Sequence, residues 1–186
     1  MDTPFMRIIA EAVGAAGFRV ARFEFPYMSA RREDGKKRPP DRGPVLSESW
    51  RAAIRALSRS GGPGALVIGG KSLGGRIASM VADESGVAGL VCLGYPFHPP
   101  GRPDVLRVAH LEKLRTPALM IQGERDAFGT RDEIARYSLS KKISMVFLPD
   151  GDHSFKPRAT SGRTEAQNLT EAAAVVVEFL AKRVAG

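Results

Sequence analysis

Four short, unbroken runs of apolar residues constrain the fold of this 186-residue chain more than any other feature. They cover residues 65–68, 90–93, 118–121 and 143–148. Such runs are typical of strands in a parallel sheet whose two faces are both covered by helices. Stretches with helical periodicity separate the runs, at 73–83, near 105–114 and at 131–137. Because strand and helix alternate, the sequence predicts a doubly wound α/β fold.

The rest of the chain supplies further elements. Thr3 and Pro4 are typical of the start of a helix, which Gly17 ends. Residues 18–25 interleave apolar and charged side chains and predict one more strand near an edge, for a mostly parallel sheet of about five strands. Residues 29–44 contain proline, glycine and charge without a period and predict a long exposed loop. Helices are also expected over 46–57, ended by the glycines and proline of 61–64, and over 165–184, entered through Thr164 and Gln167 as a capping box.

Composition excludes several classes of protein. The length suits one domain, so residues 1–186 are expected to form a single domain. A hydrophobic content of 43% with 26% charged residues excludes a disordered chain. Cys92 is the single cysteine, which excludes an internal disulfide or a cysteine zinc cluster and favours a reducing, cytoplasmic location. No apolar run approaches the roughly 18 residues of a membrane span, and the start lacks the pattern of a secretory signal.

The first apolar run leads directly into Gly70-x-Ser72-x-Gly74 and then into a helix. This is the setting of a nucleophile elbow, a sharp strand-to-helix turn that lifts a serine hydroxyl out of the backbone. The small residues two positions before and after the serine are expected to let strand and helix approach. A phosphate-binding loop is the alternative, but it requires its first glycine after the strand, and Gly64 precedes the strand.

A nucleophilic serine needs a base, and the base needs a group that orients it. Asp126 follows the apolar run at 118–121, and His153 follows the run at 143–148. Because the carboxyl ends of parallel strands meet at one edge of a sheet, both are expected near Ser72. An Asp in a turn and an exposed His are the simpler interpretation of each residue alone. The other candidate acids are Glu124, Asp132 and Asp152.

Three motifs carry a family resemblance: Gly-Gly-Lys-Ser-Leu-Gly-Gly-Arg at 69–76, Gln-Gly-Glu-Arg-Asp-Ala-Phe-Gly at 122–129 and Gly-Asp-His-Ser-Phe at 151–155. They resemble the α/β-hydrolase superfamily, in its small KANL-type and Tex-type, dienelactone-hydrolase-like branch, over nearly the whole chain. The resemblance implies that Ser72 is the nucleophile, that His153 is the general base and later the acid, and that Asp126 holds the imidazole. It also implies an oxyanion donor and a substrate pocket, with the backbone N–H of Leu73 as the donor and Tyr95, Phe97 and His98 as pocket residues.

The chain departs from that family at its start. Members place a strand and a His-Gly-rich loop before the first helix, and that loop supplies the second oxyanion donor. By the family's topology the strand would lie between residues 18–25 and 65–68. The expected fold is therefore an α/β-hydrolase fold that lacks its N-terminal strands, and a truncated start is favoured over a shortened variant. Without the second donor, turnover is expected to fall by about 10² to 10³.

Three functions compete on these observations. The first is a serine hydrolase that cleaves a small ester, thioester or amide through an acyl-enzyme, with no cofactor and no metal. The alternative is a catalytically idle hydrolase-like fold that serves as an interaction module. Nucleic-acid binding through the basic segment 29–44 is disfavoured because Tyr27 is its one nearby aromatic. Lys71 and Arg76 are further candidates, as cations that favour an anionic substrate.

Overall fold

A computed structural model of the chain describes residues 3–60 and 65–184, and a parallel sheet forms its centre. The strands are β1 (Val67–Lys71), β2 (Gly89–Leu93), β3 (Ala118–Gly123) and β4 (Ile143–Leu148), and they lie in the order β1-β2-β3-β4. Every neighbouring pair is parallel, with Ile68 opposite Leu90 and Cys92 opposite Met120. The predicted fold class is confirmed, with four strands in the sheet where about five were expected.

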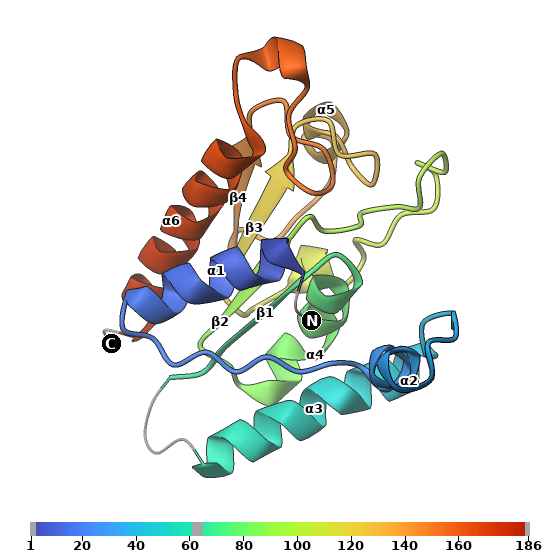
Figure 1. The fold of residues 1–186 in the computed structure, drawn as a ribbon, viewed down its shortest axis with the longest axis vertical. Coiled ribbons are helices and arrows are strands. Elements are labelled where there is room, and N and C mark those ends of the chain that lie inside the picture. The colour runs from blue at the N-terminus through green and yellow to red at the C-terminus, as the bar shows by residue number, and fades with distance from the viewer. Residues whose placement is uncertain (1–2, 61–64, 185–186) are drawn as a thin grey trace.

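Helices cover both faces of the sheet, as the unbroken apolar runs require (Figure 1). On one face, α1 (Pro4–Ala15) and α6 (Glu165–Val184) pack over side chains such as Val91. On the other face, α3 (Gly43–Ser60) and α4 (Leu73–Ser85) pack over side chains such as Leu90. Neighbouring residues of a strand therefore belong to two different cores. The run 61–64, predicted to end α3, lies outside the described residues.

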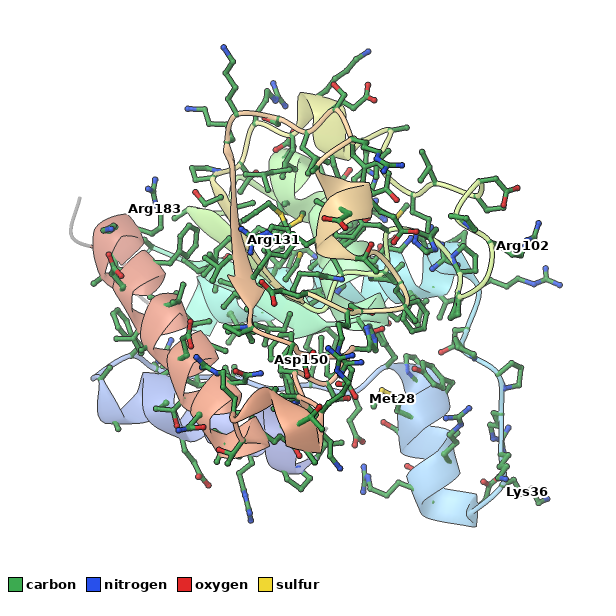
Figure 2. The ribbon with its side chains drawn as sticks, turned by 90° about the horizontal axis from the view of Figure 1, so that it is seen from above. Met28, Lys36, Arg102, Arg131, Asp150 and Arg183 are labelled. Carbon is green, nitrogen blue, oxygen red and sulfur yellow. The ribbon has the colours of Figure 1, made fainter. Side chains whose placement is uncertain are left out.

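The prediction of a single long loop over 29–44 is wrong in its first part. Residues Pro26–Asp34 form the helix α2, which ends at Gly35 in the left-handed conformation with φ 68°. Figure 2 shows α2 at the side of the molecule, with Met28 towards the body and Lys36 beyond the far end of the helix. No residue of α2 is buried. Helices that face a core have apolar residues at every third or fourth position, and the sequence of α2 therefore lacks this periodicity.

Two connecting helices are shorter than predicted. The stretch near 105–114 contains one 3-10 turn, Leu111–Lys113, and the stretch at 131–137 contains α5 (Arg131–Ile134). A second 3-10 turn, Ala159–Ser161, precedes α6. Within residues 3–60 and 65–184, no helix has both the length and the apolar character needed to cross a bilayer.

The predicted strand at 18–25 is also wrong, because these residues are not paired with the sheet. Residues 17–22 instead line a cavity of about 580 Å³ together with residues of α1, β1, β2 and α6. Extended backbone becomes a strand only when a neighbour completes its hydrogen bonds. The aromatic side chains pack elsewhere: the rings of Phe23 and Trp50 of α3 meet edge to face at 4.7 Å.

Candidate active site

Ser72 occupies a strained turn between β1 and α4. Its φ is +51°, a value that residues other than glycine seldom adopt. The turn is held on both sides, since the Ser72 N–H donates to the Leu93 carbonyl at 2.9 Å and the Ser72 carbonyl accepts from the Arg76 N–H at 3.0 Å. Ser72 is the N-cap residue of α4, yet its hydroxyl makes no capping hydrogen bond. The hydroxyl is therefore available for other partners.

Two glycines let β1 and α4 approach at this turn. A Cβ added to Gly70 would lie 2.7 Å from the carbonyl carbon of Gly74, and one added to Gly75 would lie 2.5 Å from the Gly70 oxygen. A Cβ on Gly74 would meet nothing within 4 Å. The expectation that the small size of Gly74 is required is therefore wrong, because the close contact belongs to Gly70 and Gly75.

The imidazole of His153 lies between Ser72 and Asp126. Its Nε2 is 2.9 Å from the Ser72 Oγ, and its Nδ1 is 2.8 Å from the Asp126 Oδ2. Since a carboxylate only accepts, Nδ1 carries the proton and Nε2 can accept from the serine hydroxyl. The Asp126 side chain is fully buried, whereas 23% of the His153 side chain is exposed. Solvent therefore reaches the His153 side chain but not the carboxylate.

Gln122 and Phe128 surround the Asp126–His153 pair, and the sequence analysis gave neither a role. The buried Gln122 Nε2 donates to Asp126 Oδ2 at 2.8 Å, and its Oε1 accepts from the Tyr95 N–H at 2.8 Å. The Phe128 N–H donates to Asp126 Oδ1 at 2.9 Å, and the Phe128 ring lies 4.3 Å from the imidazole. A polar residue at the end of an otherwise apolar strand was the signal for Gln122, because a buried amide requires partners.

The loop that carries His153 is tightly packed. The Asn168 side chain, buried in α6, donates to the Phe155 carbonyl at 2.7 Å and to the Pro149 carbonyl at 3.2 Å. Phe155 itself is fully buried and has a φ of +68°. On the opposite side, a Cβ added to Gly123 would lie 2.3 Å from the Asp152 carbonyl oxygen. These contacts fix the backbone from which the imidazole projects.

Leu73 is the first residue of α4. The N–H groups in the first turn of a helix have no acceptor inside the helix, so the Leu73 N–H makes no hydrogen bond within α4.

The three residues expected in the substrate pocket lie in the core instead. Tyr95 and Phe97 are fully buried and His98 is 3% exposed. The Tyr95 hydroxyl donates to the Arg107 carbonyl at 2.9 Å, and burial raises its pKa. The loop after β2 folds back on the sheet, so these side chains present no surface to a ligand.

The other candidate acids have structural partners away from the imidazole. Glu124 accepts from the Asp150 N–H and pairs with Arg131 at 2.8 Å. Asp152 accepts from backbone N–H groups of its own loop, and Asp132 is exposed on α5. Among the described residues, Asp126 is the carboxylate in contact with His153.

The two cations near the elbow differ in their surroundings. Lys71 donates from Nζ to the His153 carbonyl at 3.0 Å. Arg76 is half-buried on α4, and within the described part of the chain its Nε has no hydrogen-bond partner.

The α/β-hydrolase class is defined by a strand, a strained serine turn and a helix, followed by an Asp and a His on the loops after later strands. The family model described as "alpha/beta hydrolase domain" matches residues 1–181. The chain therefore belongs to the α/β-hydrolase domain family.

Solved structures share the fold. An α-β serine hydrolase homologue from Coxiella burnetii has a TM-score of 0.72 and 20% identity, over 97% of this chain and 77% of that one. A lidless α/β serine hydrolase from Xanthomonas campestris has a TM-score of 0.73 and 18% identity, over 100% and 76%. An esterase domain from Rhodothermus marinus has a TM-score of 0.66 and 22% identity, over 98% and 80%.

Proposed function

We propose that the chain is a serine hydrolase that cleaves a small ester, thioester or amide through an acyl-enzyme. The observation that carries the proposal is the continuous contact from Ser72 Oγ to His153 Nε2 at 2.9 Å and from His153 Nδ1 to Asp126 Oδ2 at 2.8 Å. This arrangement meets the geometric requirement for nucleophile, base and orienting group.

The chemistry follows from the contacts. The Ser72 oxygen attacks the substrate carbonyl carbon while its proton moves to His153 Nε2. The tetrahedral intermediate collapses, the bond to the leaving group breaks, and the leaving group takes the proton from Nε2. Water then attacks the acyl-serine by the same route and releases the acid. Asp126 keeps the proton on Nδ1 throughout, and the Leu73 N–H donates to the oxyanion.

The connection between β2 and β3 supports a small substrate. Residues 94–117 contain no α-helix, only the 3-10 turn Leu111–Lys113. They fold back over the sheet with Tyr95 and Phe97 buried. So short a connection holds no large cap over the site, which argues against long lipid substrates.

The test is covalent labelling of the folded protein with a fluorophosphonate probe, followed by intact-mass and peptide analysis. We expect one adduct on Ser72, none in Ser72→Ala and slow labelling in His153→Ala. Ser154→Ala is the matched control, because Ser154 is an exposed serine beside His153, and its labelling should equal that of the wild type. Hydrolysis of short p-nitrophenyl esters, acyl thioesters and acyl anilides then ranks the three substrate classes.

The alternative makes the opposite prediction. A catalytically idle hydrolase-like interaction module keeps the fold but has no reactive serine. Absence of labelling in the folded chain, or equal labelling of Ser72→Ala, would therefore support the idle module and reject the hydrolase.

A further inference from the structure

Lys71 stands immediately before Ser72 and its side chain contacts the loop that carries the base. It is the last residue of β1, and its Nζ donates to the His153 carbonyl oxygen at 3.0 Å. The same carbonyl faces Gly94, where an added Cβ would lie 3.0 Å from the oxygen. The His153 backbone is therefore enclosed between an ammonium donor and a glycine that leaves room for it.

The Lys71 ammonium is held by the protein's own groups. Its Nζ lies 5.0 Å from the centre of the Phe5 ring, and the Phe5 and Phe155 rings are 5.0 Å apart. Within residues 3–60 and 65–184, no carboxylate forms an ion pair with Lys71. Burial lowers the pKa of Lys71, and the charges of Asp126 and Asp152 oppose that shift. A carbonyl oxygen, an aromatic face and two nearby carboxylates thus stabilise the cation.

We propose that Lys71 is a positioning residue for His153, because its hydrogen bond to the His153 carbonyl fixes the loop from which the imidazole projects. The inference rests on the proposed serine hydrolase. This role differs from the expectation that Lys71 binds an anionic substrate. The contacts of the Lys71 ammonium are with the His153 carbonyl and the Phe5 ring. A base held in line with Ser72, as His153 Nε2 is at 2.9 Å from the Ser72 Oγ, can accept the serine proton, whereas a base on a displaced loop cannot.

Two variants test the contact between Lys71 and the His153 carbonyl. Lys71→Met keeps an unbranched side chain of similar length but removes both the donor and the charge. Lys71→Arg keeps the charge and a donor. Lys142→Met is the matched control, because Lys142 is exposed and makes only backbone contacts. Thermal melts first establish that each variant is folded.

The first readout is hydrogen exchange of peptides that cover residues 149–158, which does not depend on a reactive serine. We expect about tenfold faster exchange in Lys71→Met, and wild-type exchange in Lys142→Met. Unchanged exchange in Lys71→Met would overturn the proposal whether or not Ser72 reacts.

The second readout is the rate of fluorophosphonate labelling of Ser72. Loss of the hydrogen bond releases the loop, so the imidazole is held in line with Ser72 for less of the time and the rate should fall about tenfold in Lys71→Met. Lys71→Arg keeps a donor and should label at close to the wild-type rate. Faster exchange with an unchanged labelling rate would reduce Lys71 to a structural residue and overturn the inference. A wild-type chain that is not labelled at all would instead reject the proposed hydrolase.

Discussion

The strained backbone at Ser72 is accommodated because two nearby residues, Gly70 and Gly75, have no side chain. A φ of +51° costs a serine on the order of 1 to 3 kcal/mol unless the surroundings hold it there. The Leu93 carbonyl and the first turn of α4 hold it, and the contact between Gly70 and Gly75 brings strand and helix close enough for both hydrogen bonds. The position of the hydroxyl beside His153 is therefore a property of the whole turn.

Substitution of the elbow glycines tests this interpretation. Gly75→Ala should destabilise the protein by about 1 to 3 kcal/mol, because its Cβ would lie 2.5 Å from the Gly70 oxygen and the backbone must shift. Gly74→Ala should be neutral or stabilising, since its Cβ meets open space and alanine favours a helix. Urea unfolding measures both variants. Equal losses in the two would show that the close approach is not what requires Gly75.

The residues of the candidate site differ in how far the sequence predicted them. Ser72, Asp126 and His153 each follow an apolar run, so position in the strand order was enough to place them together. A role for Gln122 was not predicted, because its partners, among them Asp126 and the Tyr95 N–H, come from the loops after different strands. Tyr95 and Phe97 were expected at a surface, but sequence does not reveal that the loop after β2 turns inward.

At the scale of elements, periodicity predicted those that face a core and missed those that do not. The strands β2, β3 and β4 and the helices α4 and α6 lie close to their predicted ranges, because burial gives each a hydrophobic pattern. Helix α2 has no such pattern and depends on single contacts. Its N-cap residue Phe25 makes no side-chain capping bond, and the Tyr27 N–H instead donates to the carboxylate of Asp41, 14 residues later, at 2.9 Å.

Asp41→Ala should therefore loosen α2. A nine-residue helix is marginal alone, and loss of a capping acceptor costs about 1 kcal/mol. We expect several-fold faster hydrogen exchange in peptides of residues 26–34, with the sheet unchanged. Lys37→Ala, on the same exposed segment, should leave exchange at the wild-type rate. Wild-type exchange in Asp41→Ala would mean that other contacts, such as Arg32 with Glu24, hold the helix.

For the molecule as a whole, the parallel sheet explains why distant residues meet. All four strands end at one edge, so the loops after β1, β3 and β4 bring Ser72, Asp126 and His153 together although 81 residues separate the first from the last. The same topology leaves the outer edge of β1 without a partner strand among the described residues. Residues 18–25 have the composition of a strand but are not paired with that edge, so a local pattern could not predict their state.

The loop edge also carries a charge network that links stability to pH. Asp150, near the middle of the view in Figure 2, pairs with Arg158 at 2.5 Å and with Arg125 at 2.9 Å. The hydrogen bonds from Arg158 and the positive charge of Arg125 lower the pKa of Asp150 to about 2. In an unfolded chain the carboxyl has a pKa of about 3.9. Its stabilising contribution is therefore complete above about pH 4 and is lost as the pH falls towards 2.

Asp150→Asn should remove this pH-dependent contribution to the unfolding free energy and little else, because asparagine tolerates the φ of +52° at this position. The difference in unfolding free energy between wild type and Asp150→Asn, measured with urea at pH 6, 4, 3 and 2, should be largest at pH 6 and shrink steadily below pH 4.

Acid also destabilises the protein in a second way that acts in the same direction. Protonation of the other carboxylates removes negative charge from a chain whose net charge is already +8, so repulsion between its positive charges increases. Asp104→Asn separates the two effects, because Asp104 is exposed and in no ion pair within the described residues. Its difference from the wild type should stay nearly constant with pH, and a constant difference for Asp150→Asn as well would show that the Arg158 and Arg125 contacts contribute nothing specific.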